Sequence, residues 1–227
     1  WYVLPRIFPE YLPGAGGYKS FGMVWEPGQE LPVGFSKKTV GFPRITNNCA
    51  SCHTATFRTK EAEEPRVEVA GPAHTSDVQS YLRFLFKVAE DPRFNANVIL
   101  HEIDLVYDLS WLDKLLYRYL IIPLTKKALL EQRDQFAWMN REGWPDWGPG
   151  RDDPMNLTKY FMAGLPVDTS VGNADFPSIW NLGIREGHSL NWDGVTPSPR
   201  SVIIDSALGL GAPPDASFRE RMERIEE

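Results

Sequence analysis

Two cysteines and one histidine stand close together in the segment Cys49-Ala50-Ser51-Cys52-His53. The spacing Cys-x-x-Cys-His is the attachment signature of haem c. In this signature the two thiols bond to the vinyl groups on one edge of a porphyrin, and the adjoining histidine offers its imidazole to the iron. The motif therefore predicts one covalently attached haem c, bound through Cys49 and Cys52, with His53 as an axial iron ligand.

A redox dithiol and a zinc site are the alternative interpretations of the same cysteine spacing. A zinc site needs four ligands, usually with a second close pair of Cys or His. The chain has no other Cys, and His74, His101 and His188 are not spaced as a pair. A thioredoxin-like dithiol requires a βαβ context, which the pattern lacks. The histidine directly after the second cysteine therefore favours haem c over both.

The second axial ligand of the iron separates electron carriers from catalysts. An iron with His/Met or His/His ligation moves electrons, whereas an open position can bind O₂ or peroxide. His74 lies in a loop 21 residues after His53 and is a candidate distal ligand, with a structural loop histidine as the alternative. We expect His101 to face solvent on a helix. The other candidates are His188, Met23, Met155 and Met162, and the sequence leaves the choice open.

The composition excludes one class of partner and indicates a compartment. The 227 residues carry a net charge of −6 without a basic stripe, which argues against nucleic-acid binding. The longest apolar run, Leu120-Ile121-Ile122-Pro123-Leu124, is far shorter than the roughly 20 residues of a membrane-spanning helix, so we expect no transmembrane segment. Covalent haem attachment predicts a periplasmic or outer-surface location. The first residues lack a signal-peptide pattern and the chain ends abruptly, so we expect a piece of a longer protein.

The pattern of apolar residues, prolines and glycines predicts a mainly α fold with long loops. Helical spacing indicates a helix from Asp77 to about Glu90, capped by Thr75 or Ser76. Further helices are expected over 97–107, 110–122, 125–141 and about 198–208. Residues 1–48 and 143–200 are expected to be mostly irregular, with Gly14-Ala15-Gly16-Gly17 as a flexible turn. A small hairpin is expected around Val33, Val40, Val67 and Val69.

The expected domain organisation follows from these elements. Residues 1–48 are predicted to form a Pro/Gly-rich arm that packs on the haem domain. Residues 49–227 are predicted to form a cytochrome c-like haem domain with a helical insertion at about 75–142. We expect the arm and the domain to form one structural unit.

Beyond the haem motif, several stretches resemble the N-terminal half of bacterial dihaem cytochromes related to rubber oxygenase and, more distantly, to dihaem cytochrome c peroxidase. They are Trp25-Glu26-Pro27-Gly28 with Leu31-Pro32-Val33-Gly34-Phe35-Ser36, Trp147-Gly148-Pro149-Gly150-Arg151-Asp152 with Asn156, Asp175-Phe176-Pro177-Ser178-Ile179-Trp180-Asn181, and Trp192-Asp193-Gly194 followed by Ala207-Leu208-Gly209. Together with the haem motif these stretches span most of the chain.

The resemblance implies roles for two residues. Trp192 matches a tryptophan near the haems, where it would relay an electron; packing against the haem edge is the alternative. Arg151 could pair with a haem propionate, because a guanidinium forks onto a carboxylate, or form a structural salt bridge with Asp152, Asp153 or another acid. The resemblance also implies Ca²⁺ near a second haem that this chain does not carry.

The chain departs from the family pattern in two ways. A second Cys-x-x-Cys-His is absent, and no Phe lies in Asp205-Ser206-Ala207-Leu208-Gly209, where rubber oxygenase has a shielding Phe. Rubber cleavage is therefore not expected. The leading hypothesis is a peroxidase- or oxygenase-like haem c oxidoreductase that passes electrons through Trp192 to a second haem domain or a redox partner protein. The alternatives are a six-coordinate electron-carrier subunit of a larger complex and a structural subunit with a vestigial haem.

Overall fold

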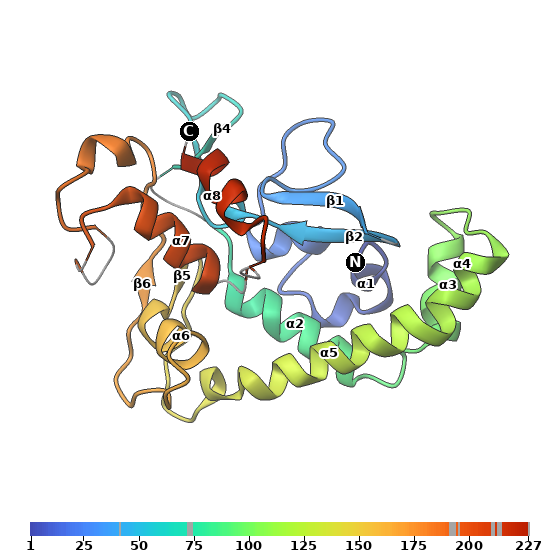
Figure 1. Cartoon of the computed structure of the whole chain (residues 1–227). Helices are drawn as coiled ribbons and strands as arrows, with labels where there is room; N and C mark the ends of the chain where they lie inside the picture. Colours follow the sequence, from blue (N-terminus) through green and yellow to red (C-terminus); the bar gives the residue numbers. More distant parts are fainter. Residues whose placement is uncertain are drawn as a thin grey trace. The chain divides into compact units, whose positions relative to one another are not determined.

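The computed structural model describes residues 1–40, 42–71, 75–190, 194, 196–209, 212 and 215–226. Over these ranges the protein is mainly α-helical, with small antiparallel two-stranded sheets (Figure 1). Contacts divide the chain into two compact units. Unit 1 comprises residues 1–51 and 75–150, and unit 2 comprises residues 52–74 and 151–227.

Unit 1 contains most of the long helices. Its elements are α1 (Leu4–Ile7), η1 (Pro9–Tyr11), η2 (Gly17–Phe21), β1 (Phe35–Val40), β2 (Phe42–Asn47), η3 (Cys49–Ser51), α2 (Val78–Glu90), α3 (Ala96–Asp104), α4 (Trp111–Leu116), η4 (Tyr117–Ile121), α5 (Ile122–Gln135) and η5 (Ala137–Asn140). The elements of unit 2 are β3 (Thr54–Phe57), β4 (Arg66–Val69), β5 (Arg151–Asp152), α6 (Pro154–Phe161), β6 (Ala174–Asp175), η6 (Leu182–Arg185), α7 (Pro199–Gly209) and α8 (Phe218–Glu226).

Polar caps start the helices of unit 1 close to the predicted positions. The side chain of Asp77 accepts a hydrogen bond from Ser80 N at 2.9 Å, so α2 is capped by Asp77 and not by Thr75 or Ser76 as predicted. The predicted cap at Ser110 is confirmed, because its hydroxyl accepts from Asp113 N at 3.2 Å.

The sequence left open whether Pro123 kinks or separates two helices, and in the structure it does not separate them. It lies in the first turn of α5, directly after the π-helical turn η4, where the helical hydrogen-bond pattern changes. The π-helical turn η4 joins α4 directly to α5, and α5 ends at Gln135. The predicted helices 110–122 and 125–141 therefore form a continuous helical run, which a short 3₁₀ turn follows.

Aromatic side chains dominate the core of unit 1. The rings of Trp1 and Tyr18 stack with centroids 4.0 Å apart, and Tyr18 donates its hydroxyl proton to Trp1 O at 2.8 Å. Phe8, Phe21 and Phe84 are fully buried around them. This core joins the first residues of the chain to α2, so the predicted arm 1–48 and the predicted insertion 75–142 lie in the same unit.

The four valines that were expected in one hairpin lie in different parts of the structure. Val40 ends β1, which pairs antiparallel with β2, whereas Val67 and Val69 lie in β4, which pairs with β3. Val33 precedes β1 and lies outside both hairpins. The prediction of one hairpin was wrong because two separate sheets form.

Helix α6 lies in the segment 143–200, where the sequence predicted mostly loops with short helical turns. Asp153 caps it by accepting from Asn156 N at 3.0 Å, and Pro154 occupies the first helical position. An Asp followed by Pro is a helix-start signal, which the surrounding glycines and prolines obscured.

None of the helices in the described ranges combines the length and apolarity needed to cross a membrane.

Candidate functional site

The two cysteines of the haem-attachment motif flank a tight turn. Cys49 begins the 3₁₀ turn η3, and Cys52 follows it. Asn48 holds the turn: its side chain accepts from Ala50 N at 3.0 Å, and its carbonyl accepts from Ser51 N at 3.0 Å. Neither cysteine is in a disulfide and both are partly exposed.

Gly34 lies directly against this turn. Its carbonyl accepts from Asn48 N at 2.8 Å. Its backbone has a φ of +82°, and a Cβ built there would lie 2.0 Å from Ser51 N and 2.4 Å from Ser51 Cα. Only glycine tolerates both the left-handed conformation and the close approach. The sequence analysis noted Gly34 only as part of a resemblance, without this role.

The imidazole of His53 is oriented by a backbone carbonyl. Its Nδ1 lies 2.7 Å from Pro177 O, 124 residues away in the chain. A carbonyl oxygen only accepts hydrogen bonds, so the proton is on Nδ1 and Nε2 keeps its lone pair. Histidines that bind metals commonly donate their other ring nitrogen to a carbonyl in this way. Burial lowers the pKa of His53 although the Pro177 contact opposes the shift, which favours the neutral imidazole that binds iron.

The segment 175–181 holds Pro177 against His53. Trp180 Nε1 donates to Val69 O at 2.7 Å, and Ile179 N donates to Ala70 O at 3.3 Å. Ala70 N in turn donates to His53 O at 2.6 Å, with Ala70 in the left-handed conformation at φ 66°. The segment and the end of the β3–β4 hairpin thus form one hydrogen-bonded frame around His53.

Phe176 covers the histidine from the same segment. Its ring is 6.1 Å from the His53 ring at an interplanar angle of 61°, and its side chain is buried. The Phe-Pro pair therefore supplies an apolar wall and the hydrogen-bond acceptor next to each other. The sequence analysis singled out this stretch by resemblance but assigned no role to Phe176 or Pro177.

Arg151 forms an ion pair inside unit 2. Its Nε lies 3.5 Å from Asp175 Oδ1, and the two residues face each other across the β5–β6 ladder. Both side chains are exposed, so the pair contributes little stability. This arrangement corresponds to the structural alternative named for Arg151, with Asp175 as the acid.

Two neighbouring carboxylates follow Arg151 and differ in their surroundings. Asp153 is fully buried and accepts from Asn156 N and from Asn156 Nδ2, at 3.0 and 2.7 Å. Asp152 Oδ1 is also buried, but it has no hydrogen-bond partner among the described residues. Burial, and to a smaller extent the charge of Asp153, raises the pKa of Asp152 to about 7. Asp152 is therefore half protonated near neutral pH.

Replacing Asp152 with Asn should change the pH dependence of stability. Between pH 4 and 7 the folded wild type keeps a proton on Asp152 that the unfolded chain, with a carboxyl pKa near 3.8, has lost. Wild-type stability should therefore fall as the pH rises through this range. Asp152→Asn should remove this decline and be more stable at pH 8 by up to about 4 kcal/mol. Urea unfolding at pH 4.5, 6 and 8 measures the difference. The exposed Asp205→Asn serves as control, and parallel pH profiles for wild type and Asp152→Asn would contradict the assignment.

The structure describes some of the remaining candidate ligands. His74 and Trp192, the candidate distal ligand and the candidate electron relay, lie outside the described residues. The expected exposure of His101 on a helix is confirmed, and His188 is also exposed. Met23 is buried in the core of unit 1, whereas Met155 and Met162 are exposed. Among the described residues no three His, Cys, Asp or Glu side chains gather as a set that would hold a bare metal ion.

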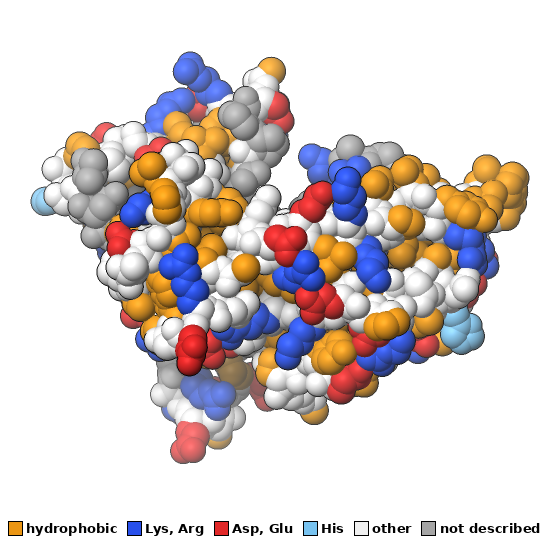
Figure 2. Space-filling model, turned by 90° about the horizontal axis from the view of Figure 1, so that it is seen from below, with side chains coloured by type: hydrophobic (Ala, Val, Ile, Leu, Met, Phe, Trp, Pro, Cys, Tyr) orange, Lys and Arg blue, Asp and Glu red, His pale blue; other side chains and the backbone are white. Residues whose placement is uncertain are grey.

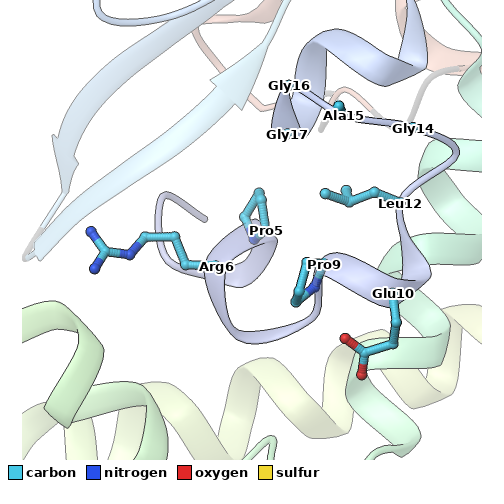
Figure 3. A pocket seen from close by; sticks show the side chains of 9 residues that line it. All are labelled: Pro5, Arg6, Pro9, Glu10, Leu12, Gly14, Ala15, Gly16 and Gly17. Carbon is cyan, nitrogen blue, oxygen red and sulfur yellow. The ribbon is translucent and has the colours of Figure 1, made fainter.

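A separate pocket in unit 1 lacks convergent polar groups. It is lined by α1, η1 and the Gly14-Ala15-Gly16-Gly17 turn. Figure 3 shows Pro5 and Leu12 facing each other while the side chains of Arg6 and Glu10 point away. Arg6 instead pairs with Glu102 at 3.3 Å, and Glu10 pairs with Arg93. The glycine-rich segment therefore forms a turn, as the sequence indicated, and both charged residues of the pocket lining are paired with other side chains.

The donor set around His53 fits a covalently attached haem. Cys49 begins the turn η3, Cys52 follows it in the chain, and the imidazole of His53, the next residue, contacts Pro177 O through Nδ1 and has a lowered pKa. The porphyrin supplies the equatorial ligands of haem iron, so a single protein imidazole suffices on one side. Comparison of the chain with protein-family models, curated proteins and solved structures gave no match.

Proposed function

We propose that this chain is a c-type cytochrome domain that carries one haem, linked to Cys49 and Cys52, with His53 Nε2 on the iron. The observation that carries the proposal is the hydrogen bond from His53 Nδ1 to Pro177 O at 2.7 Å. A histidine that binds a metal almost always donates its other ring nitrogen to a carbonyl, a carboxylate or water, and the contact with Pro177 O matches this pattern.

The chain's own residues have distinct tasks in this proposal. Cys49 and Cys52 fix the cofactor in register with His53. Pro177 holds the imidazole in one orientation and increases its basicity, and Phe176 limits access of water to the ring. When bound, haem supplies an iron that takes up and releases one electron at a potential set by its axial ligands and their surroundings.

The wider proposal concerns the reaction and the fold. It comprises a cytochrome c-like fold, a periplasmic or outer-surface location, and oxidoreductase chemistry of the peroxidase or oxygenase type with a second haem domain or redox protein as partner. Trp192 as electron relay, Arg151 as propionate partner and His74 as distal ligand belong to this proposal through the family resemblance. A six-coordinate electron carrier is the alternative, and the spin state of the ferric protein distinguishes the two.

The test is to produce the chain behind a secretion leader in a bacterium with the haem c maturation machinery. The purified protein should show one covalently bound haem by intact mass and by the pyridine haemochrome spectrum. His53→Ala should keep the thioether-linked haem but lose the native iron–imidazole spectrum, and added imidazole should restore it. His101→Ala, an exposed histidine, is the control.

The outcomes separate the hypotheses. A high-spin ferric spectrum that responds to cyanide supports the peroxidase- or oxygenase-like assignment, and an unresponsive low-spin spectrum supports the carrier. Unmodified thiols in the matured wild type would overturn the proposal as a whole.

A further inference from the structure

Unit 1 exposes a large apolar surface on its outer helical run. We define the α4–α5 apolar face as Trp111, Leu112, Leu115, Tyr119, Leu120 and Leu124, all of which are exposed. Trp111 and Tyr119 are the most exposed of the six, at 70% and 73%. Figure 2 shows hydrophobic side chains gathered at the end of unit 1 that carries α3 and α4, at the right of the view. Apolar surface of this extent usually marks an interaction site.

The π-helical turn η4 keeps these residues on one face. Trp111, Leu115 and Tyr119 repeat at a spacing of four, and Leu112, Leu120 and Leu124 are separated by multiples of four. On a regular α-helix, two residues four positions apart point in directions that differ by about 40°. A row of residues at this spacing would therefore wind gradually around the helix. A π-turn places more residues in a turn and reduces this drift. The exposed apolar residues therefore form a continuous surface.

The opposite side of the same helical run anchors it to unit 1. Ile122 is buried in the hydrophobic core, and Tyr117 and Leu129 pack against that core. The run is therefore apolar on two sides, and only one of them is covered by unit 1. The exposed apolar side of a helix whose other side is already anchored indicates a second apolar environment.

The charges beside the face indicate which environment this is. From Trp111 to Leu130 the chain carries four cations and one acid, Asp113, although its net charge is −6. Lys114 pairs with Asp104 at 2.9 Å, and Lys127 lies 3.7 Å from Glu131. Arg118 donates to Asn97 Oδ1 and Lys126 to Phe94 O, and neither has a salt bridge within the described ranges. Unneutralised cations beside exposed Trp, Tyr and Leu match the interface of an anionic bilayer.

We propose that the α4–α5 apolar face binds this protein to an anionic lipid surface. The helical run lies in the plane of the interface, with Trp111 and Tyr119 among the headgroups and the leucines below them. Arg118 and Lys126 attract the lipid phosphates. A symmetric dimer through this face is disfavoured, because it would bring the cations of two copies together.

Vesicle co-sedimentation tests the proposal with the purified full chain. The wild type should bind phosphatidylcholine vesicles that contain 30% phosphatidylglycerol more tightly than vesicles of phosphatidylcholine alone, and salt should weaken the binding. Arg118→Gln with Lys126→Gln should lower the affinity about thirtyfold. Trp111→Ser, Leu112→Ser, Tyr119→Ser and Leu120→Ser combined should lower it about a hundredfold or more.

The control is Ile184→Ser with Leu165→Ser, which removes two exposed apolar side chains from unit 2. Its affinity for vesicles should equal that of the wild type, and circular dichroism checks that every variant folds. Absence of wild-type binding to anionic vesicles, or equal losses in the control, would overturn the proposal. So would a concentration-dependent dimer in sedimentation velocity that the fourfold Ser variant abolishes, because the occupant would then be a second copy. None of these readouts requires haem, so the result is independent of the proposed function.

Discussion

A variant with both Cys49→Ala and Cys52→Ala should contain no covalently attached haem after passage through a maturation system that loads the wild type. Thioether bonds can form only at cysteine sulfurs, and the chain has no other cysteine. Heme-stained denaturing gels and intact mass measure the loss directly. The single variants should each retain at most one thioether bond. His53 remains in the double variant, and any haem bound there without a thioether bond should be extracted by acid acetone.

Ser51→Ala is the matched control for this experiment. It changes the same turn and removes the hydrogen bond from Ser51 Oγ to Asn48 O, 2.8 Å long, but leaves both thiols and His53 in place. Its haem content should equal that of the wild type. Haem that stays covalently bound in the double Cys variant would refute the assigned attachment.

Gly34→Ala should strongly destabilise the protein although it lies outside the Cys-x-x-Cys-His motif. The new Cβ would meet Ser51 N at 2.0 Å, and both partners are backbone, so neither can move aside cheaply. The left-handed φ of +82° adds conformational strain. We expect a loss of about 3 kcal/mol or more in the free energy of unfolding, together with reduced haem loading because the 49–51 turn is displaced. Urea unfolding and the haem-to-protein ratio measure the two effects.

Gly28→Ala is the control that distinguishes backbone strain at a positive φ from the steric contact of the new Cβ with Ser51. Gly28 has nearly the same φ, +79°, but a Cβ there meets nothing within 4 Å. It should cost only the conformational term of about 1 kcal/mol and leave haem loading unchanged. Equal effects of the two substitutions would show that the contact with Ser51 does not matter.

Local sequence signals were sufficient to predict a structural feature where residues close in the sequence determine it. The Cys49-to-His53 spacing is contiguous, so its chemistry can be predicted without a fold. The start of the helix at Ser110 was predicted correctly because a cap acts within its own first turn. The start of α2 was misjudged by one or two residues, since Thr75, Ser76 and Asp77 are all competent caps and packing decides among them.

Tertiary structure alone decided what surrounds these residues. Pro177 meets His53 through a backbone carbonyl from 124 residues away, and a carbonyl leaves no trace in the pattern of side chains. The need for glycine at position 34 arises from its approach to Ser51, and the raised pKa of Asp152 arises from burial. The sequence by itself contained the Cys-x-x-Cys-His spacing and predicted a mainly helical chain. Only long-range packing determined which imidazole nitrogen is available to a metal and which apolar residues stay exposed, because both depend on contacts between segments distant in the sequence.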